Sequence, residues 1–324
     1  MIYKSFEEID PFLTHYDFKI LPLLFCDSEK IKYLWGGGGN KWSGNYNQYK
    51  KSLRSGDFGE SRYQTKSFYS YHFTKLESLM KILESRTLRF SNISRSNDKL
   101  EMKYYLNKFY PQNDEILFNQ LTQNTFVFST SNESIIDSEH ELTMWKEYGG
   151  RQTGVIIGLE MICNGNHKNY FSHVNVAYEL RDYLLFKRAN MEFTMKNSIE
   201  IDYSQCLFLP SIMHKTKGSS VEREVRTIYL PNFTNTSMVE PNANILSFIK
   251  EENENKYLEV PLNIESQFLP KINIVKIILG RKLENESASL IKELNTLFLR
   301  MLEAKEIKHY PLIEMSQCED LINY

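Results

Sequence analysis

The chain has 324 residues, of which 41% are hydrophobic and 25% charged, and its formal net charge is −2. This composition excludes a disordered chain and is typical of a globular protein with a substantial core. It provides no global basic field that would attract nucleic acid, although a local basic groove stays open as an alternative.

Cysteine spacing and hydropathy narrow the class of protein further. The four cysteines, Cys26, Cys163, Cys206 and Cys318, are widely spaced, so we expect neither a disulfide framework nor a zinc site of common spacing. The N-terminus lacks a signal-peptide core, and no apolar run approaches the roughly 20 residues of a membrane span. A cytoplasmic protein with no membrane partner is therefore expected.

Residues 1–66 are predicted to form an N-terminal extension. They contain a stretch rich in Gly, Asn, Ser and Tyr, WGGGGNKWSGNYNQYKKSLRSGDFGESRYQ, which is typical of a loop or a flexible arm. Gly36 to Gly39 and Lys41 superficially resemble a phosphate-binding loop, but the Gly-Lys-Ser/Thr ending is missing. A plain loop is the favoured interpretation.

From residue 67 the pattern tightens, and we expect one main domain over 67–315 followed by a C-terminal tail at 316–324. Runs of β-branched and aromatic residues predict strands at 68–74, 88–92, 125–131, 153–160, 174–180, 222–230, 271–280 and 307–312. Capping boxes and apolar periodicity predict helices at 74–85, 97–110, 115–121, 138–148, 188–214 and 284–305. Because strands and helices alternate irregularly, the pattern indicates an α+β fold.

Two of the predicted strands end in polar residues. His72 lies in Tyr71-His72-Phe73-Thr74, where a lone histidine is more often structural than functional. Ser129-Thr130-Ser131 end the strand at 125–131, and hydroxyls in that position alone are typical of a turn or a helix cap.

A third strand carries paired charges. Glu222, Glu224 and Arg226 fall on one face of the strand predicted at 222–230, because side chains alternate with period two. Two carboxylates so close repel each other, and Arg226 could neutralise one of them through a bidentate contact. A surface charge ladder is the alternative to a functional pair.

These three motifs, in this order, resemble those of the ADP-ribosyltransferase superfamily, in which a His or Arg strand, a Ser-Thr-Ser or Tyr segment and an E-x-E segment converge on NAD. The chain also resembles a bacterial family known as domain of unknown function 2971. That resemblance rests on segments between about Phe68 and Gly280, namely Tyr71-His72-Phe73-Thr74, Leu88 to Ser91, Asn97-Asp98 with Glu101, Met144-Trp145 with Tyr148, Gly154 to Gly158, the E-x-E-x-R segment and Ile277 to Gly280. Phe73 departs from the family's tyrosine, Lys99 from its proline, and the N-terminal extension is distinctive.

The resemblance implies an ADP-ribosyltransferase-like fold, with split mixed or antiparallel sheets, flanking helices and helical insertions. It implies an NAD-dependent ADP-ribosyltransferase that uses NAD as a substrate and requires no metal. Glu224 would bind the nicotinamide ribose and stabilise the oxocarbenium-like cation, and Glu222 would orient or deprotonate the acceptor. His72 would hold a ribose hydroxyl and Ser129 would position Glu224. The other residues expected to bind NAD are Tyr71, Phe73, Thr130, Ser131 and Arg226.

Some relatives of this family belong to bacterial defence or toxin–antitoxin systems. The resemblance therefore implies a toxin that modifies a nucleic acid, either RNA or DNA, or a protein, with an antitoxin protein as a further partner. The rival interpretation is a non-catalytic module that keeps the fold and binds a nucleotide or a protein. A nuclease is least favoured, because no acidic, His or Lys cluster has a convincing metal spacing. Core packing is the favoured role for Trp145 and Tyr148, which lie three residues apart, and a ligand wall is the alternative.

Overall fold

A computed structural model describes residues 66–95, 119, 122–163, 171–176, 178, 212, 215, 217–229, 232–233, 239–240, 243–304 and 306–318. The predicted N-terminal extension and the helices predicted at 97–110, 115–121 and 188–214 lie almost wholly outside the described residues. So does most of the predicted tail.

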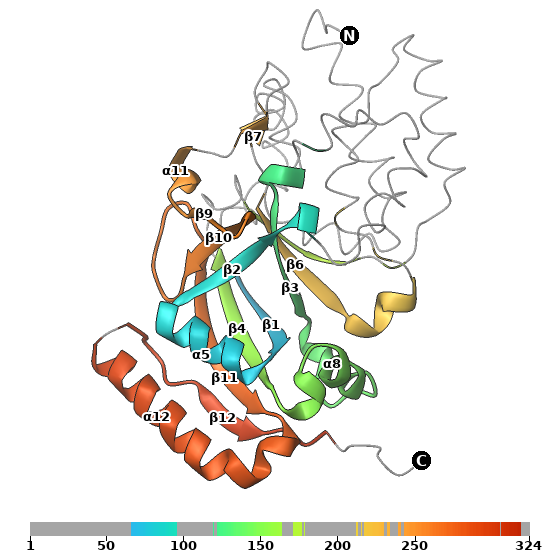
Figure 1. The fold of residues 1–324 in the computed structure, drawn as a ribbon, viewed down its shortest axis with the longest axis vertical. Helices are drawn as coiled ribbons and strands as arrows, with labels where there is room; N and C mark the ends of the chain where they lie inside the picture. Colours follow the sequence, from blue (N-terminus) through green and yellow to red (C-terminus); the bar gives the residue numbers. More distant parts are fainter. Residues whose placement is uncertain are drawn as a thin grey trace, which may run out of the picture.

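The described part of the chain is built on a ten-stranded, mostly antiparallel sheet (Figure 1). Its strands are β1 (Lys66–Thr74), β2 (Thr87–Asn92), β3 (Phe126–Ser131), β4 (Val155–Cys163), β5 (Phe171–Asn175), β6 (Glu224–Tyr229), β9 (Ile249–Glu252), β10 (Asn255–Pro261), β11 (Lys271–Leu279) and β12 (Leu312–Met315). They run in the order β12-β11-β4-β1-β3-β2-β10-β9, with β6 paired to β3 and β5 paired to β6. Two short strands, β7 (Asn232–Phe233) and β8 (Val239–Glu240), pair separately.

The described helices are α5 (Leu76–Ser85), α8 (Glu141–Glu147), α11 (Ala243–Leu246) and α12 (Ser287–Glu303), joined by the 3-10 turns η3 (Ile93–Arg95), η4 (Glu133–Ile135), η5 (Gly150–Gln152), η7 (Lys217–Glu222) and η8 (Arg281–Glu286). None of these helices is long and apolar enough to cross a membrane. The predicted α+β class is thus confirmed, as a mostly antiparallel sheet with flanking helices.

The core forms on both faces of β4, which is why its sequence is apolar at consecutive positions. Val155, Ile157 and Leu159 join the larger cluster, together with residues of α5 and α12. Ile156, on the opposite face, joins a smaller cluster with Trp145 of α8 and Phe73 of β1. The two clusters therefore place α8 on the face opposite α5 and α12.

Two predicted strands are shifted along the chain. The last strand, expected at 307–312, begins at Leu312. Pro311 precedes it and has no N–H to donate to a ladder, so the chain joins β11 only after the proline. The strand expected at 174–180 is β5, which begins earlier, at Phe171.

Candidate functional site

A cleft of about 950 Å³ opens among β1, β2, β3, β6, α5 and α8. All nine residues predicted as site residues line it: Tyr71, His72, Phe73, Ser129, Thr130, Ser131, Glu222, Glu224 and Arg226. Three segments that are remote along the chain therefore meet at one place.

Strand register explains this convergence. β3 lies between β1 and β6, and Ser131 is opposite Tyr71 on one side and opposite Glu224 on the other. Ser129 is likewise opposite Arg226. Residues directly opposite each other on antiparallel strands have Cβ atoms about 5 Å apart. The three motifs are thus neighbours across three adjacent strands.

The prediction that Glu222 and Glu224 share one strand face is wrong. β6 begins at Glu224, whereas Glu222 ends the 3-10 turn η7. Arg223, between them, has a left-handed φ of 43°, and its Nη1 donates to the Ser134 hydroxyl at 2.9 Å. The chain therefore turns sharply between the two glutamates. Their carboxylates come together through a shared cation instead of through strand periodicity.

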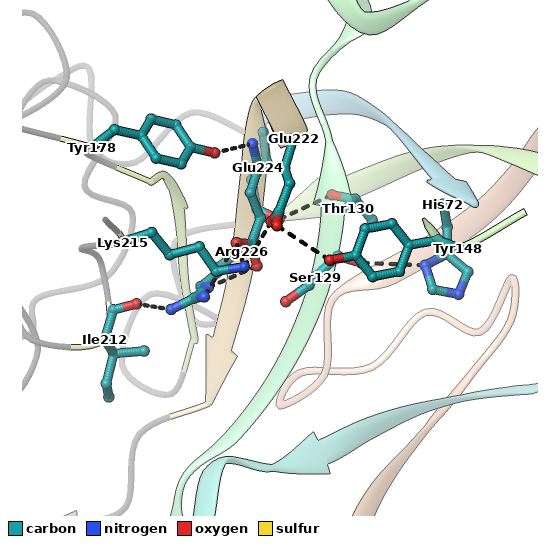
Figure 2. A network of polar contacts seen from close by, with 11 residues as sticks. His72, Ser129, Thr130, Tyr148, Tyr178, Ile212, Lys215, Glu222, Glu224 and Arg226 are labelled. Atoms are coloured by element: carbon teal, nitrogen blue, oxygen red, sulfur yellow. Dashed lines mark hydrogen bonds and ion pairs between the residues drawn. The ribbon is translucent and has the colours of Figure 1, made fainter. Parts of the chain in front are cut away.

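That shared cation is Lys215. Its Nζ lies 2.6 Å from Oε2 of Glu222 and 2.9 Å from Oε2 of Glu224 (Figure 2). No motif in the sequence points to Lys215, since it precedes the E-x-E segment by several residues and lies in no recognisable pattern.

Glu224 is the most enclosed carboxylate of the site, with 5% of its surface exposed. Arg226 binds it bidentately, with Nε donating to Oε1 at 2.8 Å and Nη2 donating to Oε2 at 3.1 Å, as predicted from the sequence. Burial alone would raise the pKa of Glu224, but the charges of Arg226 and Lys215 and the hydrogen bonds from Arg226 and Ser129 lower it to about 2. The carboxylate is therefore ionised at neutral pH.

Tyr148 also belongs to this network, contrary to its predicted packing role. Its hydroxyl donates to Oε1 of Glu222 at 3.2 Å, and the side chain is 44% exposed in the cleft. Burial and the Glu222 charge raise the pKa of Tyr148 to about 12, so the phenol remains a donor. Trp145 does pack in the core, edge-on to Phe73 with ring centroids 5.5 Å apart.

His72 is held as a neutral ring. Its Nδ1 lies 3.2 Å from the Ser129 carbonyl oxygen, and its ring packs on Phe128. Burial lowers the pKa of His72, against the opposing effect of that hydrogen bond. Because a carbonyl only accepts, the proton lies on Nδ1, which leaves Nε2 as an acceptor suited to a ligand hydroxyl.

The remaining predicted residues differ in how much they offer a ligand. The Ser129 side chain is exposed, whereas the Thr130 hydroxyl donates to the Val225 carbonyl oxygen at 3.1 Å and so fastens β3 to β6. Phe73 lines the cleft but is buried against Trp145, so its ring is not free to stack on a ligand. Tyr71 is half-buried.

The charges around the cleft cancel. Its described lining contains the cations Lys81, Arg89, Lys215 and Arg226 and the anions Glu84, Glu222, Glu224 and Glu252. Such a lining does not favour a polyanion over a small ligand of mixed character. No group of three or more His, Cys, Asp or Glu residues in the described part of the chain is arranged to hold a metal ion.

Comparisons of the chain with models of protein families, with curated proteins and with solved structures found no match. Membership of the family that the sequence resembles therefore stays a prediction, as do the domain boundaries.

Proposed function

We propose that the protein is an NAD-dependent ADP-ribosyltransferase and that the cleft binds NAD. One observation carries the proposal: His72 of β1, Ser129 of β3 and Glu224 of β6 line a single cleft. An ADP-ribosyltransferase-like arrangement of the sheet is part of the same proposal.

In this proposal Glu224 performs the main catalytic task. Cleavage of the bond between nicotinamide and ribose develops positive charge on the sugar carbon, and a fixed carboxylate stabilises that charge. The depressed pKa of Glu224 suits this role, because the group is ionised without any reorganisation. His72 accepts a hydrogen bond from a ribose hydroxyl at Nε2. The Ser129 side chain supports the Glu224 carboxylate through a hydrogen bond. Glu222, which is less enclosed, orients or deprotonates the acceptor.

The biological setting of the proposal rests on the family resemblance alone. We infer a bacterial toxin of a defence or toxin–antitoxin system that acts in the cytoplasm on a nucleic acid or a protein. An antitoxin would cover the cleft or dock on the N-terminal region.

One observation favours a non-catalytic module instead. Glu224 is already bound by Arg226 and Lys215, and its negative charge is compensated before any ligand arrives. A site built in this way could bind a nucleotide without turning it over.

Nicotinamide release separates the two functions. Incubation with NAD and cell extract should liberate nicotinamide, and Glu224→Gln should reduce the rate by about 10²–10³-fold, the usual effect of losing one electrostatic contact to a transition state. Glu251→Gln, on the exposed surface of β9, is the matched control and should leave the rate unchanged. Labelled NAD, supplied with cellular protein, RNA and DNA separately, identifies the acceptor.

The outcomes differ for each function. If calorimetry detects NAD binding but no nicotinamide is released, the non-catalytic binding module is favoured. Release that persists in a folded Glu224→Gln variant would contradict the assignment of the catalytic carboxylate.

A further inference from the structure

Lys215 occupies a position that no sequence motif assigns. Its side chain is 13% exposed, and its ammonium group touches both carboxylates of the cleft at hydrogen-bonding distance. Ile212, three residues earlier, accepts a hydrogen bond from Nη1 of Arg226 through its carbonyl oxygen. Ile212 and Lys215 together thus contact both glutamates and the arginine (Figure 2).

The charges of this cluster balance only when Lys215 is included. Glu222 and Glu224 supply two negative charges, and Lys215 and Arg226 supply two positive charges. An uncompensated charge in so enclosed a place is strongly destabilising. If the ammonium group were removed, one positive charge would remain beside two carboxylates, and the described carboxylate contacts of that guanidinium are to Glu224.

We propose that Lys215 is a positioning residue of this site, whose ammonium group holds Glu222 and Glu224 side by side and compensates their charge. Its importance for catalysis rests on the proposed function, whereas the contact itself does not. For an ADP-ribosyltransferase the arrangement allows one carboxylate to face the sugar cation while its neighbour handles the acceptor.

The other groups around the pair cannot replace this cation. Tyr148 of α8 is neutral because its pKa is raised, and it donates only to Glu222. The pKa of Tyr178, whose hydroxyl accepts from the Glu224 N–H at 2.7 Å, is also raised by burial. His72 of β1 is neutral, and Ser129 of β3 carries no charge. Loss of Lys215 should therefore leave Glu224 easier to protonate, because one of the two cations that oppose its burial would be gone, while Arg226 and the hydrogen bond from Ser129 would remain.

The test is a carboxyl titration that needs no activity. The protein is labelled with ¹³C at the glutamate carboxyl groups, and Glu224→Gln assigns the Glu224 resonance. In Lys215→Met the titration midpoint of Glu224 should rise by about 1–3 pH units, the usual effect of losing a nearby opposite charge. Lys215→Arg should restore much of the shift. Lys271→Met is the control, because Lys271 is 12% exposed and pairs with Glu265, but it lies outside the cleft lining.

Several outcomes would overturn the inference. One is a midpoint that is unchanged in Lys215→Met, and another is a shift of equal size in Lys271→Met. If Lys215→Met fails to fold, Lys215→Gln is titrated in its place. The unmodified protein provides a further check: a Glu224 midpoint at or above the ordinary value of 4.5 would show that the cluster does not lower the pKa of this group.

Nicotinamide release by the same variants distinguishes failure of this inference from failure of the proposed function. If the protein is a transferase, the acidic limb of its pH–rate profile should move to higher pH in Lys215→Met, together with the titration midpoint of Glu224. A general loss of stability would not cause this joint shift. A shifted midpoint with no nicotinamide release from any variant would support the role of Lys215 and contradict the transferase. If nicotinamide is released but Lys215→Met changes neither the pH–rate profile nor the Glu224 midpoint, the transferase is supported and the role of Lys215 is contradicted.

Discussion

Arg226 is almost fully buried on β6, and each of its described contacts serves another buried group. It donates twice to the Glu224 carboxylate and once to the Ile212 carbonyl oxygen. Arg226→Met would leave a buried carboxylate with Lys215 as its described cationic partner. Breaking a buried pair in this way typically costs about 3–5 kcal/mol, so we expect a loss of that size in the free energy of unfolding measured with urea.

Arg89→Met is the comparison for this prediction. Arg89 pairs with Glu252 at 2.9 Å, but both side chains are more than half exposed, at 54% and 56%. An exposed pair contributes at most about 1 kcal/mol. If both variants lost the same stability, burial would not be what makes the Arg226 pair important.

Single residues also mark the limit of what the sequence could predict about the site. The resemblance of three ordered motifs to a known superfamily was what led us to expect His72, Ser129 and Glu224 at one site. The Glu222 contact could not be derived correctly, because period-two reasoning assumes an unbroken strand and Arg223 has a left-handed φ. Lys215 could not be found at all, since a lysine without a motif is indistinguishable from a solvated one. Tyr148 was misassigned because residue type and helical spacing do not distinguish a tyrosine that packs in the core from one whose hydroxyl reaches a carboxylate across a cleft.

At the scale of elements, apolar runs were the most reliable guide. The strand predicted at 153–160 is β4, an interior strand between β11 and β1, because a continuous apolar sequence requires burial on both faces. The hairpin of β9 and β10 was missed. Its turn residues Asn253 and Glu254 both have positive φ, as a type I′ turn requires, but Asn-Glu lacks the glycine that normally signals such a turn.

Close backbone packing at the strand ends leads to a second prediction. A Cβ on Gly154 would lie 2.3 Å from the Thr74 carbonyl oxygen, and one on Gly280 would lie 2.2 Å from the Gln152 carbonyl oxygen. These atoms belong to the backbone and cannot rotate away. Gly154→Ala and Gly280→Ala should therefore each cost about 1–3 kcal/mol or more through overpacking, measured by urea unfolding.

The strand ends concerned support the cleft, because β1 ends at Thr74, close to His72. Gly154→Ala should consequently reduce ligand binding along with stability. Gly218→Ala is the matched substitution, since a Cβ there meets no atom within 4 Å. Its stability should change by less than about 1 kcal/mol. A loss at Gly218 as large as that at Gly154 would argue against backbone crowding as the cause.

At the scale of the whole molecule, two buried groups make stability depend on pH in separate windows. His173 lies on β5, and its Nδ1 is hydrogen-bonded to the Thr227 hydroxyl at 2.9 Å. Its ring packs on Phe68, with ring centroids 4.5 Å apart. Burial lowers the pKa of His173 from 6.5 to about 4. The pKa of Glu224 is lowered from 4.5 to about 2, because its cationic partners outweigh its burial.

Both shifts have the same sign for folding. In each case the unfolded chain binds the proton more tightly, so acid favours unfolding. The contribution of His173 is complete above its unfolded pKa of 6.5 and is lost as the pH falls toward 4. That of Glu224 is complete above 4.5 and is lost as the pH falls toward 2. His72 adds to the upper window, since burial lowers its pKa as well.

Urea unfolding at a series of pH values should separate the two windows. Between pH 6.5 and 4, the free energy of unfolding of the unmodified protein should fall more steeply than that of His173→Gln, by up to about 1.4 kcal/mol per pH unit, which is the effect of one proton. Glu224→Gln should keep the steep upper window and flatten only the range below 4.5, so it serves as the internal comparison. If the free energy of unfolding falls in parallel with pH for the unmodified protein and His173→Gln, the buried imidazole takes up its proton in the folded state as readily as in the unfolded chain. The packing of β5 against β6 and Phe68 would then be too open to exclude water from His173.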